Sequence, residues 1–122
     1  MKEPAEQISL LKLQNMLKEF VAEREWEKFH TPKNLATALS VEASELLEPF
    51  QWLSRGDRSE LSESMYKSVY YEIADVFSYL VLLADKLEID IYEAVLEKIK
   101  LNREKYPVEK ARGNAQKYSE YR

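Results

Sequence analysis

Apolar residues recur along the chain at the three- and four-residue spacing of an α-helix, and polar breaks divide the pattern into segments. A first helix is expected over residues 5–26, where apolar side chains stand at positions 10, 13, 17, 20 and 21. A second helix is expected from Thr31, an N-cap that is followed by a proline, to about Ser54.

Two capping patterns predict where the remaining helices begin. Asp57 and Glu60, just after Gly56, form the predicted capping box of a third helix that extends to about residue 87. Asp90 and Glu93 repeat this pattern for a fourth helix, which ends before residue 107. The alternation typical of strands is missing and the connections are short. The predicted fold class is therefore all-α, an antiparallel four-helix bundle.

Residues 108–122 differ in composition from the helices before them. Val108 is the only aliphatic residue there larger than alanine, and four basic residues against two acidic ones give a net charge of +2. We therefore expect a helical domain over 1–107 and a basic, polar C-terminal tail over 108–122. This tail is either a solvated terminal segment or an arm that closes over an anion or a neighbouring subunit.

The third predicted helix is apolar on too many sides for a surface helix. Its apolar residues are Ile73, Ala74, Val76, Phe77, Leu80, Val81, Leu82 and Leu83. A helix that is apolar all round is buried all round. Because a chain of 122 residues has little else to cover such a helix, we predict an obligate homo-oligomer.

Composition excludes several kinds of site. Cysteine is absent, which rules out disulfides, thiolate zinc sites and iron–sulfur clusters. His30 is the single histidine, and the two glycines lie too far apart for a P-loop or a dinucleotide fingerprint. The net charge is 18 − 22 = −4, and no segment is apolar enough to span a membrane. We expect a cytoplasmic protein, with no membrane and no nucleic-acid polymer among its partners.

Two pairs of acids stand where apolar residues are expected. Glu42 interrupts the leucine stripe of the second predicted helix, and Glu45 follows one turn later. Glu72 interrupts the stripe of the third, and Asp75 follows three residues later. If the two helices pack side by side, four carboxylates converge and repel one another. A hard divalent cation, Mg²⁺ or Mn²⁺, relieves this repulsion because the cluster offers only oxygen ligands.

Two alternatives compete with this metal site. Di-iron proteins of the bundle type use Glu-x-x-His motifs, which the lone His30 does not supply. The Glu-x-x-Glu spacing is also common on solvated helix faces that bind nothing. The apolar surroundings of both pairs strengthen the case for a metal site, and the solvated face stays open as the alternative.

Aromatic and cationic residues near helix ends are further candidates. Trp26 and Trp52 either pack in the core or form a slot in which a nucleobase stacks. Lys98 and Asn102, four residues apart, are either a surface lysine and a capping asparagine or a functional ammonium and amide on one helix face. His30 is expected to pack rather than to catalyse.

In this order, the motifs resemble those of the MazG-type, all-α nucleoside triphosphate pyrophosphohydrolases and, within them, the dCTP pyrophosphatase branch. The acidic signature is Glu42-Ala-Ser-Glu45 on one helix and Glu72-Ile-Ala-Asp75 on the next. Segments 25–30 and 32–35, Phe50-Gln51-Trp52, and Lys98-x-x-x-Asn102 with the following Tyr-Pro also match. The resemblance covers about residues 8–107, and residues 108–121 resemble the tail of microbial members.

The resemblance implies a role for each candidate residue. The ligands of Mg²⁺, for which Mn²⁺ can substitute, would be Glu42, Glu45, Glu72 and Asp75. The base and sugar pocket would be lined by Trp26, Trp52 and Tyr79, with His30 and Asn34 nearby. The residues facing the phosphates would be Lys98 and Asn102. Family members are dimers or tetramers in which a neighbouring subunit can complete the site.

The predicted function is hydrolysis of a nucleoside triphosphate, dCTP or a modified dCTP, to the monophosphate and pyrophosphate. Water would attack the α-phosphorus, with Mg²⁺ neutralising phosphate charge and lowering the pKa of the water. Glu45 is the candidate general base. Two alternatives stay open: a non-catalytic helical oligomer that binds a nucleotide or a protein partner, and a related enzyme acting on dUTP or phosphoribosyl-ATP.

Overall fold

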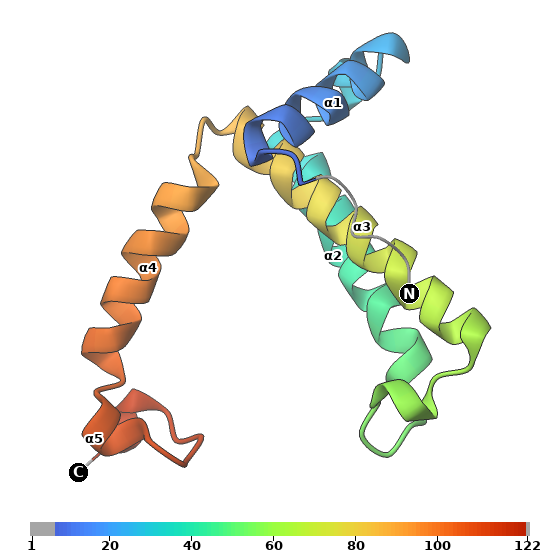
Figure 1. The fold of residues 1–122 in the computed structure, drawn as a ribbon. Helices are drawn as coiled ribbons and strands as arrows, with labels where there is room; N and C mark the ends of the chain where they lie inside the picture. Colours follow the sequence, from blue (N-terminus) through green and yellow to red (C-terminus); the bar gives the residue numbers. More distant parts are fainter. Residues whose placement is uncertain (1–6, 122) are drawn as a thin grey trace. The chain divides into compact units, whose positions relative to one another are not determined.

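The computed structural model describes residues 7–121, and every regular element within them is helical. The α-helices are α1 (Leu10–Glu23), α2 (Pro32–Leu47), α3 (Glu63–Lys86), α4 (Ile91–Lys105) and α5 (Val108–Ala111) (Figure 1). Short 3₁₀ turns lie at Glu27–Phe29, Glu48–Phe50, Arg58–Glu60 and Tyr118–Glu120. The all-α prediction is confirmed for this part of the chain. None of the helices within it combines the length and the apolarity needed to cross a bilayer.

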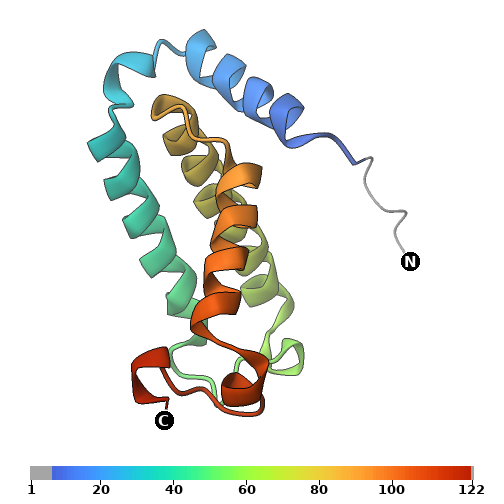
Figure 2. The same cartoon turned by 90° about the vertical axis from the view of Figure 1, so that its left-hand side faces the viewer.

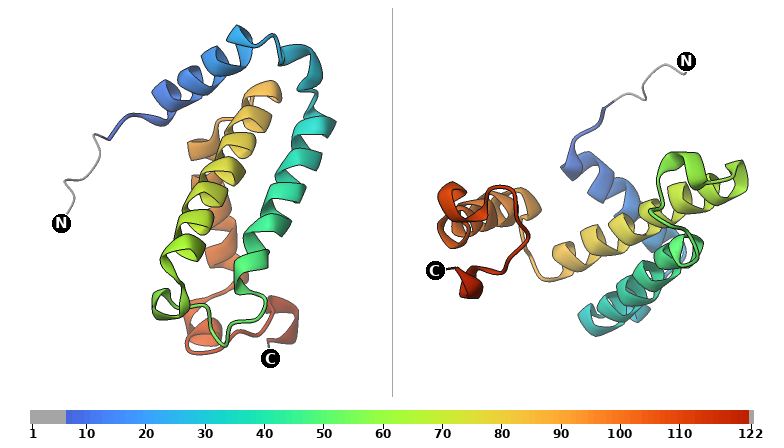
Figure 3. Two further views of the ribbon diagram at one scale, coloured as in Figure 1. Left: turned by 90° about the vertical axis from the view of Figure 1, so that its right-hand side faces the viewer. Right: turned by 90° about the horizontal axis from the view of Figure 1, so that it is seen from below.

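The chain divides into two compact units, and the division along the sequence falls between Glu88 and Ile89. The first unit contains α1, α2 and α3. Within it α2 and α3 lie side by side and run in opposite directions, as Figures 2 and 3 show. Helix α1 packs against α3. This pairing of α2 with α3 is the arrangement that the acidic motifs require.

The core of the first unit lies where its three helices meet. Val21 of α1, Leu35 of α2 and Leu82 of α3 are buried in one cluster. Burial of side chains of this size stabilises a fold by about 1.5–3 kcal/mol each. Partly buried residues that pack against the cluster are Leu17, Tyr79 and Leu83. The start of α2 is thus fixed against the last turns of α3.

Helices α1 and α2 end earlier than the sequence pattern predicted. Glu25 has φ +55° and turns the chain, so Trp26 lies beyond α1. Helix α2 ends at Leu47 and passes into the 3₁₀ turn Glu48–Phe50, which contains Pro49. Proline has no N–H to continue the helical hydrogen bonds. Helix α1 also begins later than the predicted residue 5: Ser9 caps it and Leu10 is its first residue, while residues 5 and 6 lie outside the described residues.

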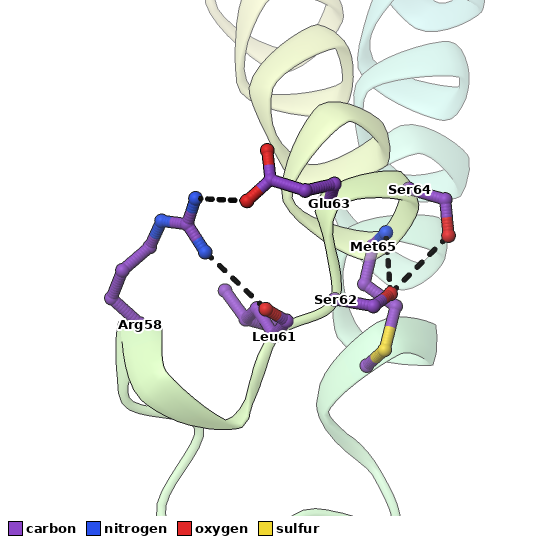
Figure 4. Close-up of polar contacts among 6 residues, drawn as sticks. All are labelled: Arg58, Leu61, Ser62, Glu63, Ser64 and Met65. Carbon is purple, nitrogen blue, oxygen red and sulfur yellow. Dashed lines mark hydrogen bonds and ion pairs between the residues drawn. The ribbon is translucent and has the colours of Figure 1, made fainter.

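Helix α3 begins later than expected, because Ser62 caps it. The Ser62 hydroxyl accepts a hydrogen bond from the Met65 N–H at 3.2 Å (Figure 4). On the same turn the Arg58 guanidinium pairs with Glu63 at 3.0 Å. Asp57 makes no side-chain capping bond. The predicted capping box of Asp57 and Glu60 is therefore wrong, whereas the predicted caps Thr31 and Asp90 are confirmed.

The carboxylate of Glu60 instead holds the loop before α3. It accepts hydrogen bonds from the backbone N–H groups of Ser54 at 2.9 Å, Arg55 at 2.9 Å and Gly56 at 3.1 Å. These bonds, first that of Arg55 and then that of Ser54, lower the pKa of Glu60. An acid at this spacing after a turn can cap a loop as well as a helix, and here it caps the loop.

Helix α3 is buried on all sides only near its C-terminal end. Val81, Leu82 and Ala84 are buried, but Ile73 is 54% exposed and Phe77 41% exposed. Leaving such side chains in water forgoes the free energy that their burial would supply. The apolar surface that motivated the predicted homo-oligomer is thus present on α3, and the oligomer itself stays a prediction.

The second unit is built around α4. At its C-terminal side the ring of Tyr106 packs edge-on against Tyr118 and Tyr121, with centroids 6.1 and 6.0 Å away. Residues 108–121 of the predicted tail therefore contain α5 and fold back on the end of α4 through aromatic contacts. The proposed boundary at residue 107 stays a prediction.

Candidate functional site

Three carboxylates meet between α2 and α3. Glu42 and Glu45 stand one turn apart on α2, and Glu72 faces them from the middle of α3. Each contributes one oxygen, and these oxygens all lie within 4.8 Å of one another. We call this group the acidic cluster. Asp75, the fourth predicted ligand, lies outside this group of three, one turn further along α3.

The acidic cluster shows the electrostatic strain of crowded carboxylates. The pKa of Glu42 is raised, first by its close contact with the Glu72 carboxylate and then by burial and the charges of Glu72 and Asp75. The pKa of Glu45 is raised chiefly by contact with Glu42 and by its charge. Charge repulsion is therefore built into the metal-free cluster.

Basic side chains do not relieve this repulsion. The ion pairs found among residues 7–121 join Lys18 to Asp85 and three arginines to neighbouring acids, and none includes a member of the acidic cluster. Glu72 Oε1 is buried without a hydrogen-bond partner. A buried carboxylate oxygen without a partner costs free energy unless a cation binds it. The donor set, all carboxylate oxygen, suits Mg²⁺ or Mn²⁺.

An aromatic pocket of about 290 Å³ is lined by Asp75, one turn along α3 from Glu72 of the acidic cluster. Trp26 and His30 line it from the segment between α1 and α2, and Tyr79 lines it from α3. The Trp26 ring packs edge-on against Phe20, with centroids 5.8 Å apart. Three of the predicted base-pocket residues, Trp26, His30 and Tyr79, therefore lie around one cavity.

Asp75 connects the pocket with the acidic cluster. It lines the pocket, and its charge raises the pKa of Glu42 in the cluster. The pKa of the Tyr79 hydroxyl is also raised, first by burial and then by the charges of Glu42 and Asp75. A molecule with a planar ring in the pocket could therefore place an attached anionic group beside the acids.

Other predicted site residues lie elsewhere. The Asn34 side-chain amide donates a 2.9 Å hydrogen bond to the Phe29 carbonyl, so it supports the turn that leads from Trp26 into α2. Trp52 is 88% exposed in the loop before α3. Lys98 and Asn102 lie four residues apart on α4 of the second unit. Their contact with a substrate stays a prediction.

Five residues that line the aromatic pocket were not among the predicted site residues: Leu17, Phe20, Val21, Ser78 and Leu82. Phe20 was assigned only to the apolar stripe of the first helix, and Ser78 was not considered. Both line the pocket. Ser78 follows Asp75 by three residues on α3, so it lies one helical turn beyond an acid already singled out. This spacing was the sequence signal from which a site role for Ser78 could have been predicted.

Comparisons with known proteins find similar sequences. Residues 37–121 match the model of the MazG-like family. The human protein named dCTP pyrophosphatase 1 is 43% identical over 104 residues, which cover 84% of this chain and 61% of that protein. The protein of the same name from Bos taurus is 42% identical, with coverage of 84% and 62%. The chain thus spans about three fifths of the length of these relatives.

A solved structure is also similar. The crystal structure of a pyrophosphatase from Archaeoglobus fulgidus superposes with a TM-score of 0.75 at 44% sequence identity. The match covers 87% of this chain and 99% of that one.

Proposed function

Because this chain belongs to the MazG-like family, we propose that it is a Mg²⁺-dependent nucleoside triphosphate pyrophosphohydrolase. The substrate proposed is dCTP or a modified dCTP, the products are the monophosphate and pyrophosphate, and the role is nucleotide-pool housecleaning. The names of the relatives from Homo sapiens and Bos taurus support the substrate.

The observation that carries this proposal is the adjacency of the acidic cluster and the aromatic pocket. A nucleotide combines a flat apolar base with a polyphosphate that binds divalent cations. The aromatic residues supply a surface on which the base can stack, and the acids supply oxygen ligands for the cation. Asp75 links the two regions, because it lines the aromatic pocket and its charge raises the pKa of Glu42 in the acidic cluster.

The residues proposed to hold Mg²⁺, or Mn²⁺ in its place, are Glu42, Glu45, Glu72 and Asp75. The buried, unpartnered Glu72 Oε1 and the absence of nitrogen and sulfur donors from the cluster fit such an ion. When bound, the cation supplies neutralisation of phosphate charge and a lowered pKa for water. Phosphoryl transfer depends mostly on positioning and charge neutralisation. The four carboxylates and the cation that they would hold are therefore sufficient for this reaction.

The remaining steps belong to the chain's own residues. Trp26 and Tyr79 hold the base and sugar, with His30, Asn34 and Trp52 contributing from the surrounding turns. Glu45 is the proposed general base, because its neighbours make its carboxylate more basic than usual. It takes a proton from the water that attacks the α-phosphorus. A new oxygen–phosphorus bond forms as the bond to the departing pyrophosphate breaks, and Lys98 and Asn102 receive the phosphates.

We further propose a homo-oligomer, a dimer or a tetramer, of four-helix bundles in the cytoplasm. Exposed apolar residues on α3 and on α4 support the oligomer, for example Ile73 at 54% and Leu96 at 69% exposed. In the second unit the tail over 108–122 is a candidate for contact with the substrate or with a neighbouring subunit.

A pyrophosphate-release assay over the deoxynucleoside and ribonucleoside triphosphates tests the proposed function. We expect release with Mg²⁺, none with EDTA, one monophosphate for each pyrophosphate, and the highest kcat/KM for dCTP or a modified dCTP. A preference for dUTP or phosphoribosyl-ATP would assign a related pyrophosphohydrolase. No release from any nucleotide by the folded oligomer would favour the non-catalytic binding protein.

A further inference from the structure

The aromatic pocket contains one hydroxyl whose hydrogen-bonding state is fixed by the helix. Ser78 is partly buried on α3 and lines the pocket. Its Oγ–H donates a 2.8 Å hydrogen bond to the carbonyl of Ala74, four residues earlier. A serine hydroxyl has one proton and two lone pairs. While it keeps this bond, Ser78 Oγ can only accept a hydrogen bond from a ligand in the pocket.

The other polar side chains of the pocket are less restricted. Trp26 has an indole N–H that can donate, and Tyr79 has a hydroxyl that can donate or accept. His30 has a ring N–H in either neutral tautomer. Asp75 can accept, but the proposed function assigns it to the cation. Ser78 is therefore the neutral side chain of the pocket that favours a ligand with a hydrogen-bond donor at this position.

The nucleobases differ in the group that they would present to such an acceptor. Cytosine carries an exocyclic amino group at the position where uracil and thymine carry a carbonyl oxygen. An amino group can donate to Ser78 Oγ. A carbonyl oxygen at the same position would face another acceptor, unless the hydroxyl gave up its bond to Ala74. A pocket of about 290 Å³ is at the small end of ligand sites, which favours a single-ring base.

We propose that Ser78 is a specificity-determining residue whose Oγ accepts a hydrogen bond from the exocyclic amino group of a cytosine-type base. This inference rests on the proposed function for the placement of the base in the aromatic pocket. It adds the atom that distinguishes amino-bearing from carbonyl-bearing pyrimidines.

Equilibrium binding of dCMP and dUMP, measured by calorimetry on the protein of residues 1–122, tests this inference separately from catalysis. The wild-type protein is expected to bind dCMP more tightly than dUMP. S78A should lower the dCMP-over-dUMP affinity ratio about five- to tenfold, as the loss of one buried neutral hydrogen bond implies. The same ratio of kcat/KM values for dCTP and dUTP should fall in parallel, mainly through the dCTP value.

Matched variants separate the acceptor from its surroundings. Ser44 also donates to the carbonyl four residues earlier, at 3.0 Å, but it is exposed on α2, so S44A should leave the ratio unchanged. S78T retains the oxygen and S78V replaces it by a methyl group of similar size. The ratio should be retained in S78T and lost in S78V, which provides a second test if S78A unfolds.

The possible results separate this inference from the proposed function. An unchanged affinity ratio in a folded S78A or S78V, or a wild-type protein that binds neither monophosphate, would overturn the role of Ser78. Absence of pyrophosphate release from every nucleotide, together with a Ser78-dependent binding ratio, would support the inference and overturn the proposed enzymatic function.

Discussion

Replacing Glu42 with glutamine is expected to lower kcat for pyrophosphate release more than about 100-fold, because changes even in outer-shell partners of metal ligands cost 10- to 100-fold. Glutamine keeps the length of the side chain but removes a negative charge from the centre of the acidic cluster. At the same time, the melting temperature of the metal-free protein should rise. The charge that is lost repels Glu72 and Asp75 in the folded state.

The control for this variant is E63Q. Glu63 lies in the first turn of α3, where it is 89% exposed and pairs with Arg58. Its replacement removes the same charge and should change neither kcat nor the melting temperature appreciably, because exposed ion pairs contribute little. Full activity in E42Q, or a large loss of metal-free stability in it, would contradict the assignment of Glu42 to a cation site.

Metal-free stability is expected to fall as the pH rises above about 4.3, the ordinary pKa of a glutamate, and millimolar Mg²⁺ should reverse most of this loss. The pKa values of Glu42 and Glu45 are raised in the folded state. Their contribution is therefore fully present below the unfolded-state pKa, about 4.3, and is lost as the pH rises through the folded-state values. Glu60, whose pKa is lowered, acts in the opposite direction but mainly below this pH window.

Thermal unfolding over this pH range, with and without Mg²⁺, measures the effect. At a free concentration of 100 times its dissociation constant, Mg²⁺ should stabilise the fold by about 2.7 kcal/mol, which is about 10 °C for a chain of this size. The gain should be smaller at about pH 5, because protons compete for the same carboxylates. In the E42Q protein, stability should depend much less on pH and much less on Mg²⁺ than in the wild type. A wild-type unfolding curve that does not respond to Mg²⁺ at pH 8 would contradict the cation site.

The helices were predictable because they depend on local signals. The caps at Thr31 and Asp90 form as the sequence indicated, and no strand occurs in residues 7–121. The start of α3 was not predictable, because two acids and a serine within six residues all fit a capping pattern. The choice of Ser62 depends on the loop, where Glu60 bonds to three backbone N–H groups.

The acidic cluster was predictable for a related reason. Helical spacing determines which side chains share a face, so Glu42 and Glu45 could be placed on one face of α2 and Glu72 in the stripe of α3. The aromatic pocket was harder to predict from the sequence. Its walls come from α1, from the turn before α2 and from α3, and periodicity within a helix does not show which faces of distant segments meet. Ser78 was missed because a helix serine has no signal of its own.

The measurement that tests the central claim most directly is the identification of products from dCTP hydrolysed in water labelled with heavy oxygen. We predict that, with Mg²⁺, each turnover gives one labelled dCMP and one unlabelled pyrophosphate, and that EDTA stops the reaction. This pattern requires attack of water on the α-phosphorus with a divalent cation present. Label in pyrophosphate, the formation of dCDP and inorganic phosphate, or hydrolysis that continues in EDTA would contradict the account.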